Sequence, residues 1–388
     1  MTRIYMDNAA TTRVTEPVAQ AMLPYLTEIY GNPSSVHAFG REARKAMEAA
    51  RRQVAEALGA QPNEIYFTGC GTESDNWAIR GAAEKHKSRG RHIITSAIEH
   101  HAVLHACQRL EKEGFSVTYL PVDEYGLVSP QSLKEALRED TILVSVMLAN
   151  NEIGTIEPIE ELSAIAREAG ALFHTDAVQA IGSVKIDVNQ LGVDMLSLSG
   201  HKFHAPKGVG ALYIRSGVRI GRLMEGGAQE RAQRPGTENL ASIVGLGKAI
   251  ELACADIEGH NQKLAAMRDR MIEGILSGIP EVRLNGHPQK RLPGNVNVSV
   301  RYVEGESLLL NLDFKGIAAS SGSACTSGSL DPSHVLLAIG LSHETAHGSL
   351  RFSLSEENTM QEVDQVVRAL SEITERLRQM SPLYNQSH

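Results

Sequence analysis

The sequence predicts an α/β fold: a mostly parallel, seven-stranded sheet with helices on both faces, followed by a smaller α+β domain. The first observation behind this prediction is that short, nearly continuous apolar runs alternate with helical patterns from about residue 41 to residue 260. The second is that beyond about residue 259 the strand-like segments alternate apolar and polar residues instead. Strands buried in a parallel sheet are apolar throughout, whereas strands with one wet face alternate.

Seven apolar runs are expected to form the main sheet, at residues 65–68, 92–95, 117–120, 142–148, 172–175, 194–199 and 209–214. Helical patterns precede or separate most of them, at residues 41–58, 73–87, 102–113, 130–138 and 158–169. Strand–helix alternation of this kind favours a parallel sheet. The last run follows the sixth after only a tight loop, so it could be antiparallel.

The chain changes character after a long helical region near residues 240–279. Segments 295–300 and 349–354 alternate as half-exposed strands do, and segments 305–311 and 359–380 are helical in pattern. We therefore expect a large domain at residues 14–258 and a small domain made of residues 1–13 and 259–388. The first dozen residues should join the small domain or cover the site.

Composition excludes several classes of protein. The 388 residues carry a net charge of −8 without a Lys/Arg block, which argues against nucleic-acid binding. No apolar run approaches the ~20 residues of a membrane span, and Asp7 stands where a signal peptide needs apolar residues. Four cysteines are too few for a disulfide scaffold, and because they form no CxxC pair a thiolate zinc site is not expected, so a reducing cytoplasm fits best; they are Cys70, Cys107, Cys254 and Cys325.

The run Gly-Cys-Gly-Thr-Glu-Ser at residues 69–74 joins the first predicted strand directly to a helix. Two glycines and the hydroxyl of Thr72 at a helix N-terminus predict an anion pocket, because free N–H groups and the helix dipole favour a phosphate. The run is not GxGxxG, and no GxxxxGK[ST] occurs in the chain, so a nucleotide is not specified. A plain glycine turn with a Thr cap is the alternative.

Two further strand ends carry chemically suitable residues. Asp176 follows the fifth predicted strand, with Gln179 one turn later, and Lys202 follows the sixth, between two histidines. Singly, Asp176 could be a helix cap and Lys202 a surface residue. Together with the anion pocket they are what pyridoxal phosphate needs: a lysine for the imine, a carboxylate for the pyridine nitrogen and a helix N-terminus for the phosphate.

His100, His101 and Asn151 follow two other strands. An imidazole there could stack on a cofactor ring or move protons, while the spacing of His101 and His105 also allows a metal pair, and ordinary helix-start histidines are the third possibility. Asn151 could bond a ring hydroxyl or a substrate carboxylate, or could only form an Asx turn.

Two residues of the C-terminal part complete the candidate set. Cys325 lies in a run of small residues at 318–329, where a thiolate would be accessible and reactive, unlike the cysteines in helical contexts. Arg351 lies on the alternating segment 349–354. Its guanidinium would clamp a carboxylate if it points inward, and would be an ordinary surface charge if it points outward.

In combination these segments resemble the cysteine desulfurases, the NifS/IscS-like branch of the class V aminotransferase group. The resemblance covers almost the whole chain. The Ser-Gly-Ser-Ala-Cys form of the cysteine loop is typical of the first subgroup; the Arg-x-Gly-His-x-Cys segment of the second is absent. The matching motifs are Tyr-Met-Asp-Asn-Ala-Ala-Thr-Thr at 5–12, Gly-Asn-Pro-Ser-Ser at 31–35, Gly-Thr-Glu-Ser-Asp-Asn at 71–76, Ser-Gly-His-Lys at 199–202, Arg-Pro-Gly-Thr at 234–237, Ser-Gly-Ser-Ala-Cys-Thr-Ser at 321–327 and Arg-Phe-Ser-Leu at 351–354.

The resemblance implies a homodimeric, fold-type I pyridoxal phosphate enzyme that converts L-cysteine to L-alanine and a protein-bound persulfide. By position, Lys202 corresponds to the Schiff-base lysine, His100 to the ring-stacking histidine, Asp176 to the partner of the pyridine nitrogen and Gln179 to the residue near the ring hydroxyl. The expected phosphate ligands are Gly71 (backbone), Thr72, Ser199 and His201, with Thr237 donated by the second subunit. Gly-Cys-Gly replaces the usual Ser-Gly-Ala before Thr72, a change that keeps the backbone N–H donors.

For the substrate, the resemblance implies a carboxylate site made of Asn151 and Arg351, with Asn8 near it, and Cys325 as the nucleophile that forms the persulfide. The expected partner is an iron–sulfur scaffold protein or another sulfur acceptor, where Cys325 could transiently ligate a cluster. Neither nucleic acid nor a membrane is expected. Two rivals stay open: another class V enzyme, such as an aminotransferase or a selenocysteine lyase, and a non-enzymatic sulfur or iron–sulfur carrier.

Overall fold

The structure, a computed structural model, describes residues 3–321, 332–380 and 384, so Cys325 lies outside the described residues. Its main sheet has seven strands in the order β2-β8-β7-β6-β5-β3-β4. Their bounds are β2 Ile65–Thr68, β3 His92–Ser96, β4 Ser116–Leu120, β5 Thr141–Ser145, β6 Leu172–Asp176, β7 Met195–Ser199 and β8 Gly210–Ile214. The predicted seven-stranded sheet is confirmed.

Strands β4, β3, β5, β6 and β7 run parallel, and β8 is antiparallel to both β7 and β2. The tight β7–β8 connection therefore joins two antiparallel strands, as its short length allowed. Strand β5 ends three residues earlier than predicted, yet Leu148 N still donates to Asp176 O at 2.8 Å. The chain thus stays beside β6 as far as Leu148, three residues before Asn151.

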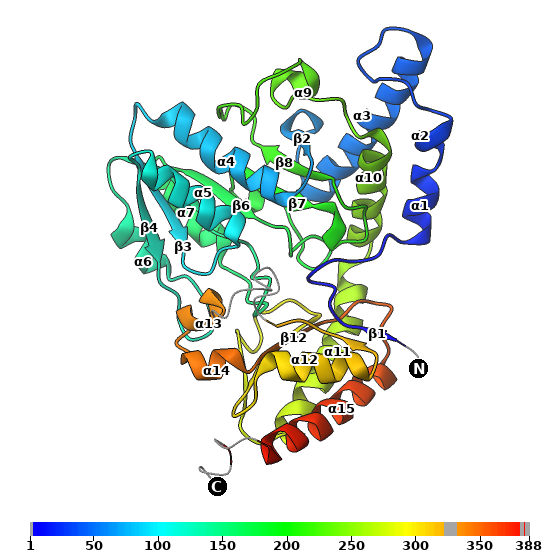
Figure 1. The fold of residues 1–388 in the computed structure, drawn as a ribbon. Helices are drawn as coiled ribbons and strands as arrows, with labels where there is room; N and C mark the ends of the chain where they lie inside the picture. The colour runs from blue at the N-terminus through cyan, green and yellow to red at the C-terminus, as the bar shows by residue number, and fades with distance from the viewer. Residues whose placement is uncertain (1–2, 322–331, 381–383, 385–388) are drawn as a thin grey trace.

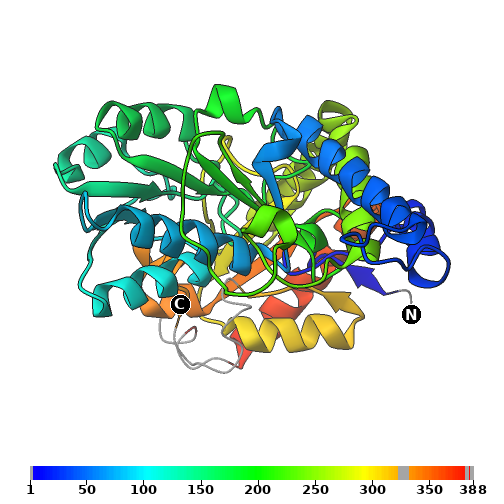
Figure 2. The ribbon, with the colours of Figure 1, turned by 90° about the horizontal axis from the view of Figure 1, so that it is seen from above.

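Helices cover both faces of this sheet (Figures 1 and 2). Each face has its own apolar cluster. One cluster joins the sheet to α3, α7 and α10, and the other joins it to α4 and α5. The helices of this part are α1 Glu16–Met22, α2 Pro24–Thr27, α3 Ala38–Leu58, α4 Gly71–His86, α5 His101–Lys112, α6 Pro130–Ala136, α7 Ile159–Glu168, α8 Val188–Leu191, α9 Gln229–Ala232 and α10 Leu240–Cys254, with short 3-10 helices at Pro62–Glu64 and Gly200–Lys202.

The C-terminal part forms a second body below the main sheet, with a separate apolar core (Figure 1). It holds an antiparallel sheet in the order β12-β10-β9 and a parallel pair β1–β11. The bounds are β1 Ile4–Tyr5, β9 Val282–Leu284, β10 Asn295–Val300, β11 Ile317–Ala318, β12 Ser349–Ser353, α11 Ile257–Gly278, α12 Gly305–Phe314, α13 His334–Ala338, α14 His343–His347 and α15 Met360–Gln379. The first strand pairs within this body, while the domain limits at residues 13 and 258 stay a prediction.

The expectation that β10 and β12 are half exposed is wrong, because every residue of both strands is buried. The polar face of these strands packs against the large part of the molecule instead of meeting water. Asn295 and Asn297 each donate from Nδ2 to Glu152 O at 3.1 Å. This buried polar face carries Arg351 to the edge of the main sheet.

Three helices, α3, α11 and α15, have 20 residues or more. Charged residues interrupt each of them. Over the described part of the chain, no helix combines the length and apolar content that crossing a membrane requires.

Candidate active site

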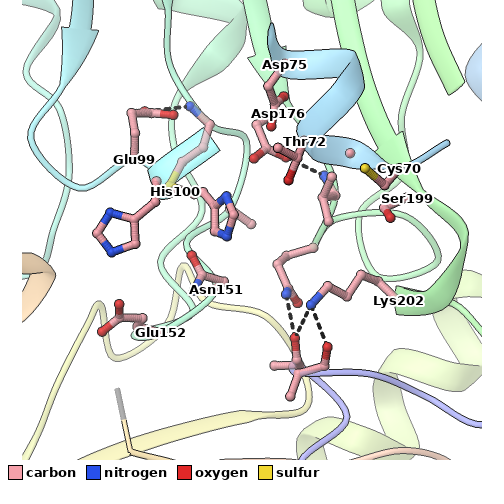
Figure 3. A pocket seen from close by; sticks show the side chains of 18 of the residues that line it. Cys70, Thr72, Asp75, Glu99, His100, Asn151, Glu152, Asp176, Ser199 and Lys202 are labelled. Atoms are coloured by element: carbon pink, nitrogen blue, oxygen red, sulfur yellow. Dashed lines mark hydrogen bonds between the residues drawn. The ribbon is translucent and has the colours of Figure 1, made fainter. Parts of the chain in front are cut away.

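A cavity of about 380 Å³ lies at the carboxyl ends of the main-sheet strands, where the N-terminal segment and β12 approach them (Figure 3). Open α/β sheets bind their ligands at this edge, and the volume is that of a small-molecule pocket. Most of the predicted site residues line the cavity: Gly71, Thr72, His100, Asn151, Asp176, Gln179, Ser199, His201, Lys202 and Arg351.

Lys202 reaches the cavity because β7 turns sharply at Gly200. A Cβ on Gly200 would lie 2.9 Å from Ala205 Cβ and from Leu246 Cδ1, so only glycine fits the turn. The amine of Lys202 donates to Ala9 O at 2.6 Å and to Ala10 O at 2.9 Å (Figure 3). The N-terminal segment therefore covers the site, which is one of the two places that the sequence analysis expected for the first dozen residues.

Asp176 ends β6 and is buried at the cavity wall. Its Oδ1 accepts a hydrogen bond from Val178 N at 2.9 Å. Burial raises the pKa of Asp176 to about 6, and the charge of Lys202 opposes that shift. A desolvated carboxylate that is still ionised at pH 7 favours a cationic group against it, as the protonated nitrogen of a pyridine ring would be.

Three buried titratable groups lie beside Asp176, and sequence reasoning missed all of them. Among the described residues, Asp75 Oδ1 and Glu99 Oε2 have no hydrogen-bond partner, and His174 Nε2 lies 3.6 Å from Asp75 Oδ1. Burial raises the pKa of Glu99 to about 8 and lowers that of His174 to about 3. One available signal was spacing, because His174 lies two residues before Asp176 and so shares its face of β6.

The start of α4 is suited to bind a phosphate. Cys70 at the N-cap makes no side-chain cap hydrogen bond, which leaves the first N–H groups of this 16-residue helix to a ligand. A Cβ on Gly71 would lie 2.7 Å from Val178 Cγ2, so the backbone here packs too closely for a side chain. Thr72, Ser199 and His201 also line the cavity. The Gly-Cys-Gly variant therefore retains the N–H donors of a phosphate site.

His100 lies across the cavity from Lys202 (Figure 3). Its Nδ1 caps α5 by accepting a hydrogen bond from Ala102 N at 3.1 Å, so the ring proton of the neutral form is on Nε2. Burial, helped by the charge of Lys202, lowers the pKa of His100 to about 4. A neutral imidazole at this place can stack on an aromatic ring or pass a proton.

The alternative metal pair of His101 and His105 is not supported. Their rings are stacked with centroids 4.9 Å apart, and the ring of His334 lies at the same distance from His101. Within residues 3–321, 332–380 and 384, no group of three or more His, Cys, Asp or Glu side chains is arranged to hold a metal ion.

Arg351 is buried and points inward, which excludes the surface alternative. Its Nη1 donates to Asn151 O at 2.9 Å, and its Nη2 pairs with Asp7 Oδ1 at 3.1 Å. The guanidinium is thus anchored on a loop of the large part and on the N-terminal segment. A cation held in a cavity wall can bind a carboxylate with defined orientation.

The structure does not bring every predicted residue to the cavity. Asn8 faces another surface hollow, and its Nδ2 donates to Ser353 O at 2.8 Å. Thr237 is exposed and does not line the cavity within this chain. Cys325, including its suggested role as a transient cluster ligand, lies outside the described residues.

Known proteins resemble this chain over nearly its whole length. Residues 4–366 match the family described as aminotransferase class-V. The cysteine desulfurase IscS of Methanosarcina thermophila is 61% identical over 380 residues, covering 98% of this chain and 94% of that protein. The cysteine desulfurase IscS of Clostridium botulinum is 57% identical over 384 residues, covering 98% and 97%.

A solved structure described as a NifS-like protein superposes with a TM-score of 0.91 at 41% identity, covering 96% of this chain and 99% of that one. The mostly parallel seven-stranded sheet surrounded by helices is that of fold-type I, and the cofactor of these enzymes is pyridoxal phosphate. Cavity, topology and similarity along the chain lead to one conclusion: the chain belongs to the class V aminotransferase family.

Proposed function

We propose that this protein is a cysteine desulfurase, which converts L-cysteine to L-alanine, collects the sulfur as a persulfide on Cys325 and supplies it for iron–sulfur cluster assembly. One observation carries the proposal: Lys202, Asp176 and Arg351 line a single cavity. These are the groups needed to attach the cofactor, to keep its ring nitrogen charged and to hold the carboxylate of an amino acid. The curated relatives of matching length support the choice of reaction.

The residues of the cavity fit pyridoxal phosphate. The uncapped N-terminus of α4, with Thr72, Ser199 and His201, would hold the phosphate. Asp176 would face the ring nitrogen, with Gln179 toward the ring hydroxyl and His100 against the ring face. The orphaned Oδ1 of Asp75 and Oε2 of Glu99 show that this wall has polar capacity beyond what the chain itself satisfies.

Bound pyridoxal phosphate supplies an electron sink for the electrons of a bond at the substrate Cα. Lys202 is the group of this chain that would take the proton from Cα, because its amine enters the cavity opposite His100. The carbonyl oxygens of Ala9 and Ala10 accept hydrogen bonds from this amine and so fix its position. With a pKa of about 6 for Asp176 and about 4 for His100, the carboxylate and the neutral imidazole are the predominant forms of these two side chains at pH 7.

The substrate is oriented by its carboxylate. Arg351 and Asn151 would bind it, and the contact from Arg351 Nη1 to Asn151 O holds the two at a fixed separation. Cys325 then attacks the sulfur of L-cysteine as a thiolate: a sulfur–sulfur bond forms, the Cβ–S bond breaks, and Cβ takes the electron pair and a proton to give L-alanine.

The homodimer is part of this proposal. Five large apolar side chains of segment 23–39 are more than half exposed: Leu23, Leu26, Tyr30, Val36 and Phe39. Exposed apolar groups gathered in this way are typical of a contact surface, and a second copy of the chain would cover them. Thr237, exposed and outside its own cavity, is then available to the partner's phosphate site. A cytoplasmic location stays a prediction, as does the scaffold protein that receives the sulfur.

Mass spectrometry of the Cys325 peptide tests the proposal. After incubation of the cofactor-loaded protein with L-cysteine, this peptide should carry one added sulfur atom, and L-alanine should be released. Cys325→Ala should bind cofactor normally and release no sulfide. Cys107→Ala is the matched control, because Cys107 is buried in α5 outside the cavity lining.

Two results would contradict the proposal in different ways. Undiminished turnover of L-cysteine by Cys325→Ala would remove the persulfide step and favour another class V activity. A purified protein that binds no pyridoxal phosphate would favour the carrier alternative instead.

A further inference from the structure

Asp75 is a buried carboxyl group of the cavity wall to which the proposed function gives no role of its own. It lies on α4, is 1% exposed and lines the cavity together with Asp176. Its Oδ1 has no hydrogen-bond partner among the described residues. A buried acid with an unused oxygen costs free energy of folding, so its place beside a ligand cavity indicates a role there.

Asp75 and Asp176 are linked through two side chains of the main sheet. His174 Nε2 lies 3.6 Å from Asp75 Oδ1, and Asp176 follows His174 by two residues on the same face of β6. Ser197 on β7 is the register partner of Asp176. Its hydroxyl bonds His174 Nε2 at 2.9 Å and also donates to Asp75. The two carboxyl groups therefore belong to one buried cluster (Figure 3).

Two buried acids of one cluster do not both ionise easily. Burial raises the pKa of Asp75 well above its usual range, and the charge of Asp176 adds to that shift. Glu99 and Cys70 make smaller contributions of the same sign, and the hydrogen bond from Ser197 opposes them. Asp75 is therefore the member of the pair that keeps a proton near pH 7.

A chain of neutral groups lets Asp75 gain or lose this proton without creating a second buried charge. The chain consists of Ser197, His174 and Ser145, whose Oγ lies 2.8 Å from His174 Nδ1. Burial lowers the pKa of His174 to about 3, so its ring is neutral and carries one proton. When Asp75 is ionised, Ser197 donates to it and the ring proton is on Nε2. When Asp75 is protonated, its O–H donates to Ser197 and the ring proton is on Nδ1.

We propose that Asp75 is a positioning residue for the cofactor ring, which holds a proton in the cofactor-free protein and releases it to the solvent when a protonated ring nitrogen binds against Asp176. The two carboxylates then share the positive charge of that nitrogen, and this favours the charged form of the ring. Asp75 acts through Asp176 and adds no step to the reaction. The inference rests on the proposed function, because it takes Asp176 as the partner of the ring nitrogen.

Calorimetric titration of the cofactor-free protein with pyridoxal phosphate tests the proton release. Measured at pH 7 in Pipes and in Bis-Tris, two buffers of different ionisation enthalpy, the heats give the number of protons exchanged. The wild type should release about half a proton or more beyond Asp75→Asn, which keeps the shape of the side chain and cannot ionise. Asp194→Asn is the matched control and should behave as the wild type does. Burial raises the pKa of Asp194 too, but this residue lies before β7, at the opposite end of the strand and outside the cavity lining.

The tautomer of His174 gives a second readout, which a merely structural role of Asp75 would not change. NMR of the histidine ring nitrogens, with the signals of His174 identified by their loss in His174→Gln, should show the ring proton on Nδ1 before the cofactor binds and on Nε2 afterwards. In Asp75→Asn the tautomer should be the same in both states. Should Asp75→Asn not fold, as judged by thermal unfolding, Ser197→Ala takes its place, because it removes the link between the ring and the carboxyl group.

Equal proton release by the wild type and Asp75→Asn would overturn the inference, and so would a wild-type His174 tautomer that stays the same on binding. Asp176→Asn separates such a failure from a failure of the proposed function. This variant should bind the cofactor about tenfold more weakly or worse, because it loses a charged contact to the ring nitrogen. An unchanged affinity would contradict the assignment of Asp176 in the proposed function, whatever Asp75 does.

Discussion

The main sheet and the small antiparallel sheet of this protein reach the cavity in different ways. The main sheet contributes polar residues at the ends of apolar strands, where Asp176 closes β6 and Lys202 follows β7. The small sheet contributes a polar face along the middle of its strands, which carries Asn297 and Arg351. Site residues of the large part thus depend on where a strand ends, and those of the small part depend on which way a strand faces.

The difference shows what an alternating pattern means. Alternation states that one face of a strand is polar, but it does not state whether that face meets water or a polar cavity. For β10 and β12 the polar face meets Glu152 and the cavity edge, so the expected half-exposed strands are buried. A strand-end residue in a parallel sheet has less freedom, because all the carboxyl ends meet at one edge.

The largest effect should follow from Lys202→Ala, in the strand-end group. Loss of the amine should lower kcat with L-cysteine about 1,000-fold or more, since no described side chain replaces it at this point of the cavity. Borohydride reduction followed by intact mass measurement should attach the cofactor to the wild type and not to the variant. Attachment at unchanged yield would show that another residue carries the cofactor.

Arg351→Gln, in the strand-face group, should have a smaller effect of a different kind. The variant loses a charged contact to the substrate carboxylate, which is worth about 1.5–3 kcal/mol, or about 10- to 150-fold in KM. Because Arg351 does not take part in the proton transfer, kcat should change less than KM. A drop in kcat at constant KM, measured in the same assay, would contradict this assignment.

The comparison of strand ends with strand faces also explains how much of the site could be predicted from the sequence. The strand-end argument located Asp176, Lys202 and the start of α4, because topology alone brings those points together. It left two possibilities for Arg351, an inward carboxylate-binding group or a surface charge. Which side of its strand is buried depends on a part of the molecule that packs on it from elsewhere in the chain. Asn8, expected near the substrate, instead bonds Ser353 O, because the N-terminal turn directs it to another hollow.

Other features had no local signal at all. Asp75 and Glu99 are single acidic residues whose neighbours become visible only when distant segments meet at the cavity. Asp7 pairs with Arg351 only because the N-terminal segment meets β12. The helical region at 240–279 was foreseen as a whole, but it divides where Asp256 caps α11 by accepting from Gly259 N at 3.0 Å. Helices α13 and α14, of five residues each, are too short for periodicity to reveal.

The two faces of the small sheet should differ in what they contribute to stability. Leu350→Ala removes a fully buried side chain from the apolar core and should cost about 2–5 kcal/mol of unfolding free energy. Asn297→Leu removes the donor to Glu152 O and the acceptor of Asn285 Nδ2 and should cost about 1–3 kcal/mol. Urea unfolding of the cofactor-free protein measures both.

The order of these two costs is the informative part. If Asn297→Leu were more stable than the wild type, the buried amides would lower the unfolding free energy, and their contribution would be to the arrangement of the site. Exposed Glu375→Gln on α15 serves as the control and should change the unfolding free energy by about 0.5 kcal/mol at most.

The smallest expected effect is a difference between the two sheets in how their contribution to stability depends on pH. The cavity edge of the main sheet buries ionisable groups, whereas the polar face of β10 buries neutral amides and a hydroxyl. Burial raises the pKa of Glu99 from 4.5 to about 8, so between these values the folded chain binds more protons at this site than the unfolded chain does. Stability contributed by this group therefore falls as pH rises from about 4.5 to 8.

Glu99→Gln keeps an oxygen to accept from Ser96 Oγ and Met147 N and cannot ionise, so its melting temperature should fall less between pH 5.5 and pH 8 than that of the wild type. Asn297→Leu should shift the whole curve without changing its slope; equal slopes for wild type and Glu99→Gln would place the pH dependence elsewhere.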